Sequence, residues 1–198
     1  MARSHARTFI AVPLEDKIRA RLVSLQEELG EAGTEVKWVE PENLHVTLLF
    51  LGEVPLRESI DVCRAVRGAV EKIAPFAMEP AGVGCFPNAR RPRTLWVGAA
   101  EGHDDLIELH QAIESPLLDL GCYRREERGY TPHITLGRIK TDAVTEELRA
   151  AIQKQADRVI GRQLVREVHV LSSELRSAGP SYTVLSREKL RAASEPVE

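Results

Sequence analysis

The chain has 198 residues, and its 27 lysines and arginines against 30 aspartates and glutamates give a formal net charge of −3. This length suffices for one large domain with a substantial buried core, and 43% hydrophobic with 29% charged residues is typical of globular proteins. The acidic balance argues against a long nucleic-acid groove, which normally carries a basic surplus, but it permits contact with one end of an RNA.

Membrane-spanning, secreted and disulfide-rich classes are also not indicated. No stretch approaches about 18 apolar residues, so we predict no membrane span. The N-terminal segment MARSHARTFIAV has no long apolar region, so we predict no secretory signal. The three cysteines, Cys63, Cys85 and Cys122, are widely spaced and include no CxxC pair. We therefore expect reduced thiols in a cytoplasmic protein, without a disulfide framework or a zinc site.

The first half of the chain alternates strand and helix signals. An apolar run at Arg7–Val12 predicts a strand, and the spacing of leucine and isoleucine predicts a helix over Pro13–Leu29. A second apolar run, typical of a strand, contains the tetrapeptide HVTL beginning at His45. The half closes with a predicted helix over about Leu56–Ile73 and a predicted strand over Phe76–Phe86.

The second half repeats this order. Arg93–Gly98 predicts a strand, and Asp104–Leu120 predicts a helix that Pro116 could interrupt. Another apolar run contains the tetrapeptide HITL beginning at His133. The remaining predictions are a helix over about Thr141–Val159 and strands over Leu164–Leu175 and Tyr182–Leu190.

Nearly equal spacing relates the two halves. Thr8 lies 37 residues before His45, and Thr94 lies 39 residues before His133. We therefore predict an α+β fold of one bilobal domain (residues 1–198), with two β-α-β-α-β halves related by a pseudo-twofold axis. The halves comprise about residues 1–90 and 91–192, residues 193–198 form a frayed tail, and antiparallel sheets flank a central cleft. The last strand can join either sheet.

Each tetrapeptide supplies one imidazole and one hydroxyl. His45 and Thr47 share one face of a strand, as do His133 and Thr135, because side chains two residues apart point the same way. Imidazole has an ordinary pKa of about 6.5, so two copies permit one acid and one base at the same pH. Cleavage of a phosphodiester needs both, and the threonine hydroxyls can stabilise the charged phosphate oxygens.

Chance explains the pair poorly. Six histidines and nine threonines in this length give about 0.3 expected His-x-Thr matches, whereas two occur, each followed by leucine, at equivalent places in the repeat. The alternative is that both are buried strand histidines with backbone partners. The remaining histidines are interpreted as incidental surface or structural residues: His5, His103, His110 and His169.

The chain resembles the 2H phosphoesterases, and among them the bacterial and archaeal RNA 2′,3′-cyclic phosphodiesterases, long called 2′-5′ RNA ligases. The resemblance is carried by TFIAVPL, VKWVEPENLHVTLLFLGEV, FPNARRPRTLWVG and YTPHITLGR, which span both halves in order. It implies hydrolysis of a terminal 2′,3′-cyclic phosphate to a 2′-phosphate, without metal or cofactor, and weak 2′-5′ ligation. His45 would be the proton donor, His133 the proton acceptor, and Thr47 and Thr135 the phosphate-binding residues.

Other residues are candidates for binding the RNA 3′ end. Arg138 follows Thr135 at an odd offset, so it reaches the cleft only if a turn or bulge lies at Gly137. Three aromatic side chains could stack on a base or pack in the core: Phe9, Trp38 and Tyr130. Two arginine clusters could guide a phosphate backbone: Arg90, Arg91 and Arg93, and then Arg124, Arg125 and Arg128.

Two alternatives remain open from the sequence. One is a phosphodiesterase of small cyclic nucleotides or of 2′-5′ oligoadenylate. The other is a non-catalytic module that binds RNA ends in the same cleft. For the main interpretation as for these alternatives, we expect a monomeric protein that does not associate with a membrane. The residues alone do not distinguish the acid histidine from the base, because the two motifs are equivalent.

Overall fold

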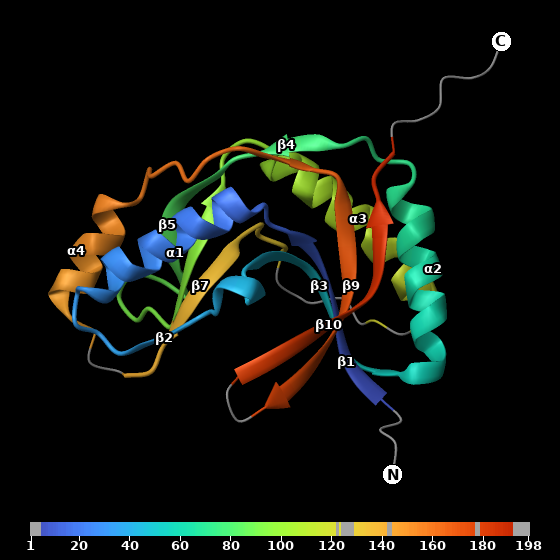
Figure 1. Cartoon of the computed structure of the whole chain (residues 1–198), viewed down its shortest axis with the longest axis horizontal. Coiled ribbons are helices and arrows are strands. Elements are labelled where there is room, and N and C mark those ends of the chain that lie inside the picture. The colour runs from blue at the N-terminus through green and yellow to red at the C-terminus, as the bar shows by residue number, and fades with distance from the viewer. Residues whose placement is uncertain (1–4, 122, 124–128, 142–143, 177–178, 192–198) are drawn as a thin grey trace.

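A computed structural model describes residues 5–121, 123, 129–141, 144–176 and 179–191 of the chain. Within these residues it contains an eight-stranded sheet, a two-stranded sheet and α-helices (Figure 1). The helices are α1 (Asp16–Gly30), α2 (Ser59–Val70), α3 (His103–Asp119) and α4 (Glu146–Lys154). No helix among the described residues is both long and apolar enough to cross a membrane.

The large sheet is antiparallel and has the order β10-β9-β1-β3-β7-β6-β5, with β2 paired to β7. Its strands are β1 (His5–Pro13), β2 (Val36–Trp38), β3 (His45–Pro55), β5 (Pro80–Phe86), β6 (Thr94–Ala99), β7 (Ile134–Ile139), β9 (Glu167–Arg176) and β10 (Gly179–Lys189). The predicted α+β class with repeated halves is confirmed. The two predicted sheets are, however, joined into one, because Val46 of β3 pairs with Ile134 of β7.

Each side of this sheet takes elements from both halves of the sequence. The late strands β9 and β10 extend the sheet beside β1, so the last strand lies on the side of the first motif. The early strands β2 and β5 pair with β7 and β6, on the side of the second motif. Figure 1 shows the same exchange for the helices, with α2 beside α3 and α1 beside α4.

The core follows the predicted helical spacing. The apolar faces of α1 and α3 are at most 1% exposed at Ile18, Leu22, Leu25 and Leu29, and at Leu106, Leu109, Ile113 and Leu117. Pro116 lies inside α3 without ending it, because only one turn follows and few helical bonds depend on its missing N–H. Burial of these two apolar faces anchors the helices against the strands that carry the motifs.

Several element boundaries differ from the sequence-based expectation. The helix expected over Thr141–Val159 is shorter, because Thr145 caps its start by accepting from the N–H of Leu148. The strand expected over Phe76–Phe86 breaks into β4 (Phe76–Met78) and β5, and the one expected over Leu164–Leu175 into β8 (Gln163–Val165) and β9. Strand β2 had no sequence signal of its own, since it has three residues.

Candidate active site

The two motifs meet where the two parts of the sheet join. Val46 and Ile134 are buried, 2% and 1% exposed, and they pair in antiparallel register. Continued by one residue either way, this register sets His45 across from Thr135 and Thr47 across from His133. Because neighbouring residues of a strand point to opposite faces, all four side chains lie on the face away from the buried pair.

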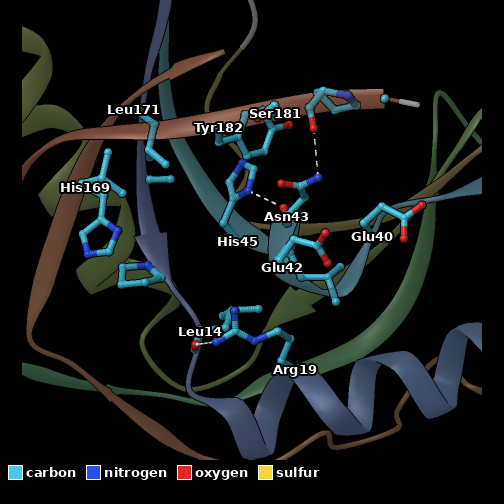
Figure 2. A pocket seen from close by; sticks show the side chains of 16 residues that line it. Leu14, Arg19, Glu40, Glu42, Asn43, His45, His169, Leu171, Ser181 and Tyr182 are labelled. Atoms are coloured by element: carbon cyan, nitrogen blue, oxygen red, sulfur yellow. Dashed lines mark hydrogen bonds between the residues drawn. The ribbon is translucent and has the colours of Figure 1, made fainter. Parts of the chain in front are cut away.

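His45 is held at both ring nitrogens. Its Nδ1 donates to the carbonyl of Asn43 at 2.7 Å, and its Nε2 lies 2.9 Å from the hydroxyl of Thr47. A carbonyl only accepts, so Nδ1 carries the proton and Nε2 accepts from Thr47. Figure 2 shows Asn43 between His45 and the chain near Ser181. The Asn43 amide donates to the carbonyl of Pro180 at 3.2 Å, which ties this support to β10.

His133 is oriented in the same way. Its Nδ1 donates to the carbonyl of Thr131 at 2.7 Å, again two residues upstream. The residue lies directly before β7 rather than inside it. Both histidines therefore use Nδ1 for orientation, and Nε2 is the nitrogen available for proton transfer in each.

Burial disfavours the charged form of both rings. Burial is the main cause that lowers the pKa of His45, which is about 4; the Asn43 carbonyl opposes the shift and the positive charge that His133 can carry adds to it. Burial also lowers the pKa of His133, with the Thr131 carbonyl opposing. Both histidines are therefore neutral at pH 7 in the free protein. An anion in the site would raise both pKa values and restore a proton to one of them.

Aromatic rings surround each imidazole. Phe9 and Tyr182 lie 5.2 and 5.7 Å from the ring of His45, measured between centroids. Phe86 and Trp96 lie 5.0 and 6.3 Å from the ring of His133. These contacts explain the depressed pKa values, because aromatic packing excludes water. Phe9 is only 3% exposed, so its ring supports His45 and leaves little surface for a nucleobase.

The leucine of each tetrapeptide is the extra residue of a β-bulge. Along β3 the register with β1 passes from Thr47 to Leu49, and along β7 the register with β6 passes from Thr135 to Gly137. Leu48 and Leu136 are thereby skipped. A bulge reverses the alternation of side chains beyond it. The bulge that Arg138 needs near Gly137 is thus present.

The bulges turn two equivalent residues toward the cleft. Phe50 follows Thr47 by three residues, and Arg138 follows Thr135 by three. Phe50 is 57% exposed, which is unusual for phenylalanine, and its ring lies 5.9 Å from that of Phe9. The sequence analysis did not select Phe50 as a site residue. Phe50 is the counterpart of Arg138 in the repeat, so the bulge that brings Arg138 to the cleft also predicts that Phe50 reaches it.

Two hollows open beside the motifs. The first, of about 440 Å³, contains His45, Thr47, Thr135, Phe50 and Trp38. Its basic residues are Arg7, Lys37, Arg138 and Lys140, and it also includes Glu40 and Tyr182. The second, of about 790 Å³, contains His133, Thr47, Phe50, Phe86, Arg93 and Tyr130. Thr47 and Phe50 line both, so the hollows form two arms of one cleft. Arg7, Lys37, Lys140 and Tyr182 had no sequence signal.

The other candidates lie at different distances from the motifs. Trp38 is half-buried in β2, where its ring lies over Gly137. The Tyr130 hydroxyl donates to the carbonyl of Thr47 at 3.1 Å, which makes it a support of the motif backbone. Arg90 and Arg91 line a separate hollow of about 480 Å³, which Arg93 borders as well. The positions of Arg124, Arg125 and Arg128 fall outside the described residues.

A third hollow, of about 610 Å³, lies next to the cleft. It borders His45 together with Arg19, Glu42 and His169 (Figure 2). Among the residues that the structure describes, no group of three or more histidine, cysteine, aspartate or glutamate side chains is arranged to hold a metal ion. The side chains that line the cleft can transfer protons through imidazole and donate hydrogen bonds from hydroxyl and guanidinium groups.

A duplicated antiparallel fold that pairs two His-x-Thr strands is the architecture of a 2H phosphoesterase. Residues 12–96 and again residues 97–182 match the family described as LigT-like phosphoesterase. The RNA 2′,3′-cyclic phosphodiesterase of Methanothermobacter thermautotrophicus is 36% identical over 177 residues, covering 89% of this chain and 95% of that protein. That of Thermus thermophilus is 37% identical over 194 residues, covering 93% and 90%.

Solved structures agree with these matches. TT0787 of Thermus thermophilus superposes with a TM-score of 0.81 at 30% identity, covering 95% of this chain and all of that one. Escherichia coli LigT complexed with phosphate superposes with a TM-score of 0.72 at 25% identity, covering 96% and 99%. The chain therefore belongs to the LigT-like phosphoesterase family, and the resemblance found in the sequence is confirmed.

Proposed function

We propose that this enzyme is an RNA 2′,3′-cyclic phosphodiesterase that hydrolyses a terminal 2′,3′-cyclic phosphate to a 2′-phosphomonoester. The observation that carries the proposal is the juxtaposition of His45 and Thr47 with His133 and Thr135 across the Val46–Ile134 pair. The names of the relatives in Methanothermobacter and Thermus support the same substrate class. We also propose a weak 2′-5′ RNA ligase activity, in which a related phosphodiester reaction would run in the direction of bond formation.

In the proposed mechanism the two imidazoles exchange one proton each with the reacting groups. Nε2 of His133 accepts a proton from water as the water oxygen forms a bond to phosphorus. Nε2 of His45, protonated in the complex, gives its proton to O3′ as the P–O3′ bond breaks. The product is a 2′-phosphate with a free 3′-hydroxyl, and the two histidines have exchanged protonation states.

Thr47 changes its hydrogen bond when His45 is protonated. In the free protein the Thr47 hydroxyl donates to Nε2 of His45 at 2.9 Å. A protonated Nε2 can no longer accept, so the hydroxyl hydrogen is released and can turn to a phosphate oxygen. Thr135, across from His45 in the register, supplies the second hydroxyl. Both would stabilise charge that builds up on the non-bridging oxygens in the transition state.

The acid and base assignments follow the family resemblance. In the free protein the low pKa of His45, about 4, opposes its role as an acid at neutral pH. The phosphate anion removes this conflict, because a negative charge beside a buried imidazole raises its pKa. We therefore propose that His45 is charged by substrate binding, whereas His133 remains the neutral base.

The cleft suits an RNA end. The exposed ring of Phe50 offers a stacking surface for the terminal base, and Trp38 lies in the same arm. The basic residues Arg7, Lys37 and Arg138 of the first arm would hold backbone phosphates, with Arg93 in the second arm. The arginines at 90 and 91 stay candidates for a more distant contact. A cytoplasmic, monomeric enzyme remains our expectation.

The direct test is incubation with an oligonucleotide that ends in a 2′,3′-cyclic phosphate, with EDTA present. We expect a 2′-phosphate product, identified by mass spectrometry and by nuclease mapping of the end. A 3′-phosphate product, or a strict need for added metal, would contradict the proposed mechanism. A matched oligonucleotide ending in a 3′-phosphate is the control and should be unchanged.

A further inference from the structure

The extra residue of each bulge, Leu48 or Leu136, is buried, and its backbone carbonyl is reached by a side chain from a helix. A buried carbonyl needs a hydrogen-bond donor. The carbonyl of Leu136 accepts from the Gln26 amide at 2.8 Å and from the N–H of Val39 at 2.9 Å. The carbonyl of Leu48 accepts from Nδ1 of His110 at 2.9 Å. Each bulge is thus capped by a side chain from the helix of the opposite half, α1 or α3.

Several neighbouring groups fix the position of the His110 side chain. Its side chain is 13% exposed, and its ring is stacked on Tyr130 with 4.2 Å between centroids and 8° between planes. Nε2 lies 4.0 Å from a carboxylate oxygen of Glu114, which also accepts from the hydroxyl of Tyr123 at 3.3 Å. The ring therefore has a defined orientation, which is not expected of an incidental histidine.

The stacked pair acts on the first motif. His110 donates to the carbonyl of Leu48, and the Tyr130 hydroxyl donates to the carbonyl of Thr47 at 3.1 Å. Two consecutive peptide groups directly after His45-Val46 are thus held from one side. These peptides set the direction of the Thr47 side chain, whose hydroxyl contacts Nε2 of His45.

We propose that His110, together with Tyr130, is a positioning residue that holds the Thr47–Leu48 backbone so that the Thr47 hydroxyl meets Nε2 of His45. The role rests on the proposed function insofar as it concerns turnover, but the geometry of the free protein can be tested without substrate. The proposed role belongs to His110, a histidine outside the two His-x-Thr motifs.

The test compares His110→Leu, which removes the donor, with His110→Gln, which can donate to the Leu48 carbonyl as Gln26 does for Leu136. The first readout is the titration of His45 by NMR. The hydroxyl of Thr47 stabilises the neutral ring, so its displacement in His110→Leu should raise the pKa of His45 by about one pH unit. His110→Gln should keep the wild-type titration. Gln26→Leu, which removes the cap of the other bulge, should also leave His45 unchanged.

The second readout is kinetic. In His110→Leu we expect kcat to fall about tenfold with KM within about twofold, because the hydroxyl is misplaced rather than the binding surface. His110→Gln should recover kcat. Tyr130→Phe keeps the stacked ring and removes the donor to the Thr47 carbonyl, so it should also raise the pKa of His45 and lower kcat. This variant replaces His110→Leu in both measurements if His110→Leu does not fold.

Unchanged His45 titration in both His110→Leu and Tyr130→Phe would overturn the inference. Equal losses in His110→Gln and His110→Leu would also overturn it, since packing alone would then be responsible. Absence of turnover by the wild-type protein would contradict the proposed function instead, and the NMR titration would still decide the role of His110.

Discussion

Val46 and Ile134 pair across the centre of the eight-stranded sheet, and each directly follows a motif histidine. This pair joins the two halves of the chain and also aligns the reacting groups. The same backbone contact that closes the sheet therefore sets His45 against Thr135 and Thr47 against His133. Loss of that register would separate the four side chains, because a shift by one residue turns every side chain to the other face.

Replacement of either motif histidine should abolish most activity while the fold survives. We expect His45→Gln and His133→Gln each to lower kcat by a hundredfold to ten-thousandfold, roughly the range for loss of a general acid or base. Turnover of the cyclic-phosphate oligonucleotide measures the effect, and circular dichroism checks the fold. His103→Gln, at a partly exposed histidine outside the two motifs, should retain full activity. Substantial activity in His45→Gln would exclude the two-histidine mechanism.

The pH dependence of kcat/KM should be bell-shaped and centred on the acid side of pH 6.5. This parameter reports the free enzyme, in which burial lowers the pKa of both histidines. The singly protonated pair is most populated between the two apparent pKa values. Bound phosphate raises both values, so the maximum of kcat should lie at higher pH than that of kcat/KM. Coincident maxima above pH 7 would argue against this account.

The buried imidazole of His45 should make the protein less stable in acid. Its folded pKa is about 4 and the unfolded value is about 6.5, so the unfolded chain binds a proton that the folded chain resists. The contribution is complete above pH 6.5 and is lost as the pH falls toward 4. Between pH 7 and 4.5 this single group should reduce the free energy of unfolding by about 2 to 3 kcal/mol.

Urea unfolding of wild type and His45→Gln at both pH values tests this linkage. The difference between the two proteins isolates the His45 contribution from other titrating groups. The variant should lose less stability on acidification than wild type. Parallel losses in both proteins would show that His45 is protonated with an ordinary pKa in the folded state.

Phe50→Ala should weaken RNA binding more than it slows chemistry. Stacking of a base on an aromatic ring contributes about 1 to 3 kcal/mol, so KM should rise at least fivefold with little change in kcat. Phe50→Trp should keep KM low, since every aromatic ring offers a face. Ile60→Ala, at a similarly exposed apolar residue of α2, is the matched control. An unchanged KM in Phe50→Ala would rule out this ring as the platform for the base.

Arg138→Gln should raise KM and weaken its dependence on salt. Each phosphate contact that is lost reduces the slope of log affinity against log salt by roughly one. The same measurement on Arg90→Gln with Arg91→Gln tests the guiding role predicted for that cluster, which lines a hollow apart from the motifs. If only the double variant alters the slope, the RNA backbone follows the Arg90–Arg91 side rather than the first arm.

Phe50 and Arg138 break the symmetry of the site. They occupy equivalent positions beyond equivalent bulges, yet one is an apolar ring and the other a cation. The two motifs by themselves are interchangeable, so the orientation of an asymmetric substrate must come from such differences. The side chains that cap the two bulges also differ, because the imidazole of His110 contacts the Leu48 carbonyl and the amide of Gln26 contacts the Leu136 carbonyl.

The sequence by itself determined the repeated order of strand and helix, the buried faces of α1 and α3, and the two His-x-Thr motifs. These features are local, because periodicity and composition within one segment predict them. The tertiary structure decided the exchange of strands between the halves, the place of the last strand beside β9, and the exposure of Phe50 beside the buried ring of Phe9 in the first arm of the cleft. Strand partners and bulges depend on segments far apart in the chain, and a bulge reverses the side-chain alternation on which a prediction from one strand relies.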